Sequence, residues 1–250
     1  MASPARPIVD AAPARAEIPR HSVLVRVTHW ITTLCFFALL LSGVEILISH
    51  PRFYWGETGN PMSPSLFDLP IPASRPWVNT GYNFVLPDQN GWSRSLHFEA
   101  AWTVILTGLV YAILGVWSRH FRKNLLPVRA GLTWRALGQD IAAHLAFRRP
   151  TAVDARSYNT LQRITYLLVI FALFPLMIWT GLAMSLAVTS VFPFLATACG
   201  GQQSARTIHF FATGLLVVFL AIHIIMICRA GFRNRVRAMI AGRIRVSEDR

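Results

Sequence analysis

The sequence predicts an all-α membrane protein built as a bundle of four transmembrane helices. Of its 250 residues, 54% are hydrophobic and only 14% are charged, which is too apolar for an ordinary soluble domain. Four runs nearly free of charge are long enough to cross a bilayer as helices. We place these spans at about residues 25–48, 96–118, 164–188 and 205–229.

The bundle is expected to occupy residues 21–242, between two tails. Residues 1–20 are rich in Ala and Pro and have the composition of a flexible segment rather than of a signal peptide. Residues 243–250 form a short C-terminal tail. The three cysteines form no CxxC motif, so neither a disulfide framework nor a zinc site is indicated.

The basic residues predict the orientation in the membrane. The net charge of +13 would suggest nucleic acid as the partner of a soluble chain, but here twenty of the 24 basic residues lie in both terminal segments and the middle connection. Positive charge collects on the cytoplasmic side. We therefore expect both termini and the middle connection in the cytoplasm, the 49–95 and 189–204 loops on the outer side of the membrane, and no nucleic-acid partner.

The middle connection carries a further pattern. The stretch around Trp134, Leu137, Ile141 and Leu145 predicts an amphipathic helix lying on the membrane surface.

Two histidines interrupt the apolar run of the fourth span. His209 and His223 are fourteen residues apart, so they share one helix face and lie about 21 Å apart along its axis. Polar side chains inside a membrane face the bundle interior and mark functional sites. The alternative is two hydrogen-bonded core histidines with no further role.

Two more spans carry a histidine near one end. In the predicted orientation His29 pairs by depth with His223 on the cytoplasmic side, and His97 pairs with His209 on the outer side. The remaining histidines lie outside the spans, beside their ends or in the middle connection: His21, His50, His120 and His144.

Glycines accompany the histidine faces. Gly43 shares the face of His29, and Gly108 and Gly115 lie near the face of His97. Because glycine has no side chain, these positions predict room for a bulky group beside the helix backbone. The third span has Pro175 and Gly181 but no histidine, and we expect it to be a structural wall.

Paired imidazoles with cleared space favour two haems, each held by two histidines. Imidazole binds several transition metals, but a bare metal site usually recruits carboxylates or thiolates as well. A bare metal site or a proton-relay transporter is the competing interpretation.

The segments HSVLVRVTHW, SRSLHFEAAW, GGQQSARTIHF and AIHIIMICRAG resemble the bacterial di-haem cytochrome b membrane subunits. That group includes subunits of nickel–iron hydrogenases and formate dehydrogenases and the wider cytochrome b561 superfamily. HPRFYWGE and YNTLQRITYLL look closest to the thiosulfate-reductase-type subunits. The resemblance covers about residues 20–242. It implies that His29 and His223 bind the cytoplasmic-side haem b and that His97 and His209 bind the outer one.

Further residues are candidates for the surroundings of the haems. Arg26 and Arg206 each precede a predicted ligand by three residues, where a guanidinium can bind a haem propionate. By analogy with the family, a quinone is expected near the cytoplasmic haem, and its candidate contacts are Tyr158, Asn159, Gln162, Arg163 and Tyr166.

The loop over residues 49–95 is long for a connection and contains Trp55, Trp77, Tyr82 and Trp92. Such loops are often functional, so we expect a docking surface for a periplasmic protein. The alternative is that these aromatics lie in the membrane interface.

Together these patterns predict an electron-transfer subunit between the quinone pool and a periplasmic redox protein, such as a molybdopterin oxidoreductase or a c-type cytochrome. One alternative is a self-sufficient cytochrome that reacts with a small oxidant or superoxide. The other is a non-redox transporter or scaffold.

Overall fold

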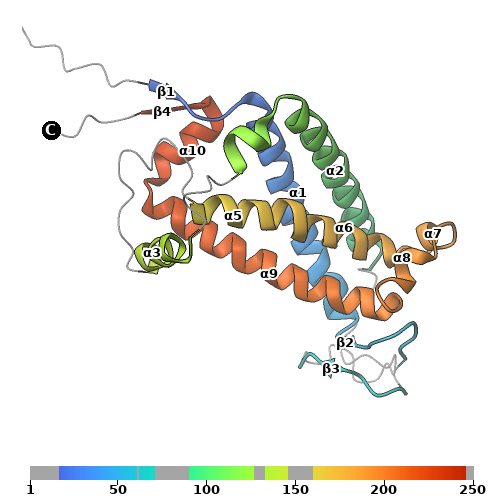
Figure 1. The fold of residues 1–250 in the computed structure, drawn as a ribbon. Helices are drawn as coiled ribbons and strands as arrows, with labels where there is room; N and C mark the ends of the chain where they lie inside the picture. Colours follow the sequence, from blue (N-terminus) through green and yellow to red (C-terminus); the bar gives the residue numbers. More distant parts are fainter. Residues whose placement is uncertain (1–16, 61, 71–89, 127–132, 146–159, 246–250) are drawn as a thin grey trace, which may run out of the picture.

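The computed structural model describes residues 17–60, 62–70, 90–126, 133–145 and 160–245. Within them, four helical segments are long and apolar enough to cross a membrane. They are α1 (Val23–Ser49), α2 (Asn90–Trp117), the combined α5–η3–α6 segment (residues 160–183) and α9 (Gln202–Arg229). The predicted four-helix membrane fold is therefore confirmed (Figure 1).

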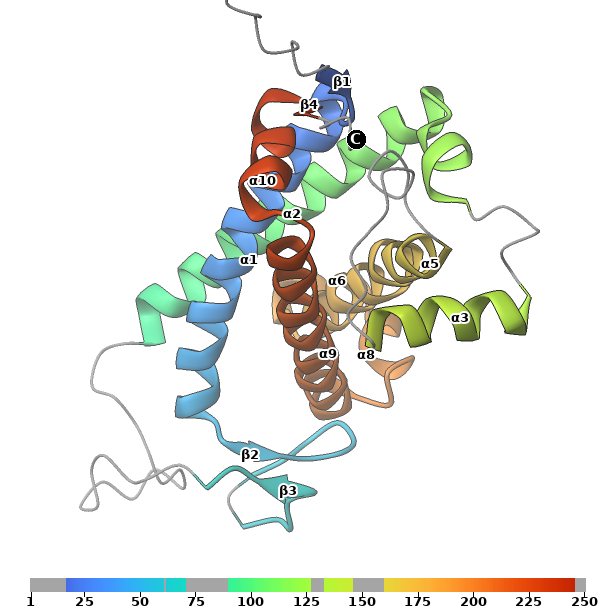
Figure 2. The same ribbon diagram turned by 90° about the vertical axis from the view of Figure 1, so that its left-hand side faces the viewer.

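The four spans pack chiefly as two pairs. α1 runs beside α2, and the third span runs beside α9 along its α6 part (Figures 1 and 2). Large apolar side chains such as Leu34 and Val116 point outward and are 76% and 68% exposed. Such an apolar exterior suits a helix bundle whose solvent is lipid.

The third span is irregular in its middle. It consists of α5 (Thr160–Leu168), the π-helical turn η3 (Val169–Leu173) and α6 (Phe174–Ala183). Pro175 is the second residue after the π turn and has no N–H to donate, so the wider turn accommodates the break in hydrogen bonding. This span ends at Ala183, five residues earlier than predicted, and α7 (Leu186–Thr189) and α8 (Phe194–Thr197) follow it.

A tight reversal follows α2. Arg119 has a φ of +53°, and the chain then forms the π-helical turn η1 (Phe121–Leu125). The ring of Phe121 occupies the space beside Gly115, where a Cβ atom would lie 2.5 Å from Cζ of that ring. The expectation that Gly115 clears space for a bound group is thus wrong, because its gap admits Phe121.

The two termini of the described chain lie at one end of the bundle, beside α10 (Phe232–Ala241) (Figures 1 and 2). β1 (Glu17–Pro19) pairs antiparallel with β4 (Arg243–Arg245). Both strands lie in the predicted tails, and their pairing joins the two tails to each other. Residues 1–16 and 246–250 lie outside the described residues.

α3 (Trp134–Leu145) coincides with the predicted amphipathic helix and contacts α5. Its Trp134 is 90% exposed.

The loop after α1 folds against the N-terminal end of α9. Its described part contains β2 (Arg52–Phe53) and β3 (Phe67–Asp68), which pair antiparallel. In Figure 1 this hairpin lies at the opposite end of the bundle from β1, β4 and α10. Residues 61 and 71–89, including Trp77 and Tyr82, lie outside the described residues.

Candidate functional site

The structure brings the four histidines together in two pairs. The ring centroids of His29 and His223 are 6.5 Å apart, and those of His97 and His209 are 6.4 Å apart. Two imidazoles that bind one metal ion from opposite sides, at about 2 Å from nitrogen to metal, have centroids roughly 6 Å apart. Both pairs therefore have the spacing that bis-histidine ligation requires.

The two pairs lie at the two ends of the bundle. His209 and His223 occupy the same helix, α9, and their fourteen-residue separation corresponds to about 21 Å along its axis. We call His97 and His209 the loop-end pair, because it lies on the side of β2 and β3. We call His29 and His223 the terminal-end pair, because it lies on the side of α10.

The donor set and its surroundings fit a haem at each pair. Each pair supplies two imidazoles from different helices, and in the described part of the chain no group of three His, Cys, Asp or Glu residues could hold a bare metal ion. Small residues lie beside the loop-end rings: a Cβ atom built on Gly43 would lie 3.5 Å from Cε1 of His97, and one on Gly181 would lie 3.6 Å from Cε1 of His209.

Gly43 lies at the opposite end of α1 from His29, where it packs against His97 on the neighbouring helix. The role of Gly181 differs from the expectation. The third span was expected to be a wall without a role at the histidines. Its Gly181 instead contacts His209, and Thr180 Oγ1 lies 2.8 Å from Nδ1 of the same ring.

Aromatic rings surround His223 at the terminal-end pair. Phe219 stacks on His223 with centroids 5.6 Å apart and an interplanar angle of 26°, and Tyr166 meets it edge-on at 6.5 Å. Gln162 lies one turn before Tyr166 on the same face of α5. Arg163 donates from Nη1 to the carbonyl oxygen of Leu126 at 2.8 Å, which ties α5 to the end of η1. Tyr158 and Asn159 lie outside the described residues.

The two arginines expected at propionates both bind backbone carbonyls. Arg26 donates to the carbonyl oxygen of Ile240 and lies against Gly242, so it fastens α1 to the end of α10. Arg206 donates to the carbonyl oxygens of His50 and Arg52, and its guanidinium lies 4.8 Å from the ring centroid of Phe53. Arg26 thus joins segments at one end of the bundle, and Arg206 joins segments at the other end. The propionate role of each arginine stays a prediction.

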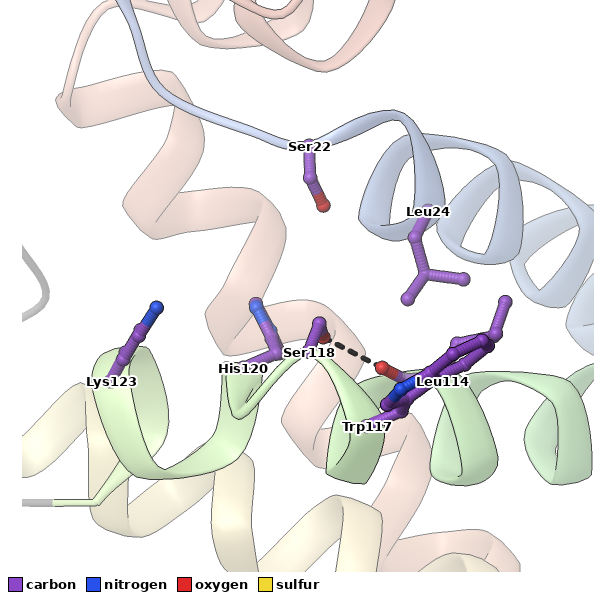
Figure 3. A pocket seen from close by; sticks show the side chains of 7 residues that line it. All are labelled: Ser22, Leu24, Leu114, Trp117, Ser118, His120 and Lys123. Carbon is purple, nitrogen blue, oxygen red and sulfur yellow. Dashed lines mark hydrogen bonds between the residues drawn. The ribbon is translucent and has the colours of Figure 1, made fainter.

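A cavity of about 560 Å³ lies where α1 begins and α2 ends. Figure 3 shows the side chain of Ser22, at the start of α1, turned toward the same space as those of His120 and Lys123, which follow α2. Apolar side chains, among them Leu24 and Trp117, complete the lining. None of the four paired histidines lines this cavity, so it is a separate feature.

Comparison with known proteins agrees with this geometry. Residues 20–242 match the family described as prokaryotic cytochrome b561. The chain belongs to this family. It is also 28% identical over 212 residues to a putative protein-methionine-sulfoxide reductase subunit, YedZ1, of Azospira oryzae, covering 83% of this chain and 89% of that relative.

Family membership and the four apolar spans make this chain a multi-pass protein of the bacterial inner membrane. The cytochrome b561 family implies haem b as the cofactor and electron transfer as the general activity. The two histidine pairs are the residues whose spacing fits that cofactor.

Sequence reasoning missed Ser42, Thr180 and the contacts of Gly181. A signal was present, since Ser42-Gly43 and Thr180-Gly181 are hydroxyl–glycine dipeptides in two apolar spans. Their partners on neighbouring helices are set by packing, which periodicity along one helix does not reveal.

Proposed function

We propose that this chain is a di-haem cytochrome b that carries electrons across the membrane between quinol and a redox protein on the periplasmic side. The supporting observation is the presence of two histidine pairs with ligation spacing, one at each end of the same bundle. A bound haem supplies one-electron chemistry at its iron. The chain's own histidine pairs would hold the two haems, one at each end of the bundle.

The arginine distribution supports the orientation in which the terminal-end pair lies toward the cytoplasm. In that orientation electrons move from the terminal-end pair to the loop-end pair as they leave the cell. An inside-negative membrane potential favours this direction by about 2.3 kcal/mol per 100 mV for a full crossing.

We assign the quinol to the face of α5 that carries Gln162 and Tyr166. Tyr166 contacts His223 directly, and the amide of Gln162 provides both a hydrogen-bond donor and an acceptor one turn away. The cavity beside Ser118 and Lys123 is another position at this end of the bundle that has both polar and apolar lining.

We further propose a periplasmic oxidoreductase as the partner. The relative from Azospira oryzae is named as a putative subunit of a protein-methionine-sulfoxide reductase, so an enzyme of that kind is the first candidate. The described outer loop supports docking, because Trp55 is 60% exposed on it.

Two measurements test this function. A pyridine haemochrome assay on the purified protein should give two haems b per chain. Right-side-out membrane vesicles supplied with duroquinol should then reduce external ferricyanide, which does not cross the membrane. The His209→Ala variant should stop this transfer, while duroquinol should still reduce the remaining haem. One haem per chain, or ferricyanide reduction at the normal rate in the variant, would refute the proposal.

A further inference from the structure

Two hydroxyl groups are completely buried beside the loop-end pair. Ser42 in α1 and Thr180 in α6 are both 0% exposed. Ser42 Oγ donates to the carbonyl oxygen of Ala38 at 2.7 Å, and Thr180 Oγ1 donates to that of Leu176 at 2.8 Å. Each hydroxyl therefore uses its single hydrogen within its own helix.

Each of these oxygens also lies at a ring nitrogen of a neighbouring helix. Ser42 Oγ is 3.0 Å from Nδ1 of His97, and Thr180 Oγ1 is 2.8 Å from Nδ1 of His209. With its hydrogen donated within its own helix, each hydroxyl oxygen is available to accept a hydrogen bond from Nδ1–H. A neutral imidazole with its proton on Nδ1 has its lone pair on Nε2, the nitrogen that is then free to bind a metal.

A glycine follows each hydroxyl in the sequence and contacts the same ring. Gly43 and Gly181 bring the helix backbone next to Cε1 of His97 and His209, respectively. The added Cβ of an alanine would only touch the ring, at 3.5 and 3.6 Å, whereas a longer side chain would collide with it. The hydroxyl thus contacts Nδ1 of the imidazole, and the glycine leaves room for the ring edge at Cε1.

This hydroxyl–glycine arrangement occurs twice, once between α1 and α2 and once between α6 and α9. Ser42 of α1 supports His97 of α2, and Thr180 of α6 supports His209 of α9. Among the described residues, the terminal-end pair has only one comparable contact, between Thr33 Oγ1 and Nδ1 of His29, and at 3.5 Å it is too long for a good hydrogen bond.

We infer that Ser42-Gly43 and Thr180-Gly181 are positioning motifs that hold His97 and His209 in the tautomer and orientation needed for ligation of the loop-end haem. The inference rests on the proposed di-haem function. Partners of this kind orient metal-bound histidines and make them stronger donors to the metal. Both histidines that would hold the loop-end haem are therefore preorganised.

The test compares Thr180→Val with Thr180→Ser. Valine keeps the shape of threonine but lacks the hydroxyl, whereas serine keeps the hydroxyl. Haem loss is followed as transfer to excess apomyoglobin, and the potential of each haem is followed by redox titration. Removing a partner of this kind typically weakens metal binding by 10- to 100-fold, so Thr180→Val should lose the loop-end haem about 10-fold faster or more.

The potential gives a second readout. Loss of the hydroxyl acceptor weakens the hydrogen bonding of Nδ1–H, so the ring donates less charge to iron, which favours the reduced form. The potential of the loop-end haem should therefore rise in Thr180→Val and in Ser42→Ala. Thr180→Ser should match the wild type in both measurements.

The control is Thr33→Val beside the terminal-end pair, which should leave the loop-end haem unchanged. The inference is overturned if Thr180→Val and Ser42→Ala both retain wild-type haem loss and potential, or if Thr180→Ser is as defective as Thr180→Val. Wild-type protein with no haem at the loop-end pair would instead refute the proposed function.

Discussion

The hydroxyl of Thr207 donates a hydrogen bond of 2.8 Å to the carbonyl oxygen of Tyr54, and both residues are buried. This contact joins α9 to the loop after α1, two residues before His209. The backbone N–H of Gly56 donates to Ser204 Oγ at 2.8 Å in the same region. The loop is thus bound to the helix that carries one histidine of the loop-end pair.

Removing this contact should destabilise the loop. Thr207→Val leaves the buried carbonyl of Tyr54 without its partner, which typically costs about 1–3 kcal/mol. We expect a lower thermal midpoint and faster proteolytic cleavage of the loop in detergent. Thr197→Val, at an exposed threonine in α8, is the control and should behave as the wild type. Equal cleavage rates in the two variants would show that the contact does not hold the loop.

Gly201 is expected to tolerate no side chain. Its φ is +112°, and a Cβ atom there would lie 2.3 Å from the carbonyl oxygen of Gly56. Gly201→Ala should therefore displace the loop from α9 and destabilise the protein more than Thr207→Val does. Thermal unfolding of the two variants in the same detergent tests this order. Gly214→Ala, where nothing lies within 4 Å of the added Cβ, should be mild.

The histidine pairs predict which substitutions act on the same haem. His29→Ala and His223→Ala should remove one redox component, and His97→Ala and His209→Ala should remove the other, because each iron needs both of its ligands. Redox titration monitored by visible absorbance distinguishes the two components. His144→Ala is the control and should leave the haem content unchanged. Loss of the same component in His29→Ala and His97→Ala would contradict the pairing.

Trp55 is expected to contribute to partner docking. Its exposed ring lies on the loop bound to α9, so Trp55→Ala should slow electron transfer to the oxidoreductase partner about tenfold, the effect of losing one aromatic anchor. Both haems should remain bound and reducible by duroquinol. Trp134→Ala in α3, on the connection at the opposite end of the spans, should have no effect. Transfer at the wild-type rate in Trp55→Ala would exclude this residue from the docking surface.

The pH dependence of stability should include a contribution from His21. Burial, with help from Arg20 and Arg235, lowers the pKa of His21 to about 4 from its usual 6.5. Between these values the unfolded chain binds a proton that the folded chain does not. The free energy of unfolding should therefore fall as the pH drops from 6.5 toward 4. His21→Gln should flatten the decline of the thermal midpoint over this range, and an unchanged slope would contradict the assignment.

Much of the fold could be predicted because a membrane constrains each span separately. Every helix must satisfy its own backbone hydrogen bonds and present an apolar surface to lipid, so composition and length alone locate the ends of α1, α2 and α9 to within six residues. The depth of each histidine follows from its position along the helix axis, and matching depths suggested which imidazoles meet.

The remaining features depended on contacts between residues far apart in the sequence. Depth along a helix does not reveal which neighbour faces a given side chain, so the hydrogen bonds from Nδ1 of His97 to Ser42 and of His209 to Thr180 emerge only when the helices pack. The same reason explains why Gly115 accepts the ring of Phe121 and why Arg206 binds carbonyls of the loop after α1. The sequence alone determined the four spans and the depths of their histidines, and only the packing of those spans decided what supports each ring.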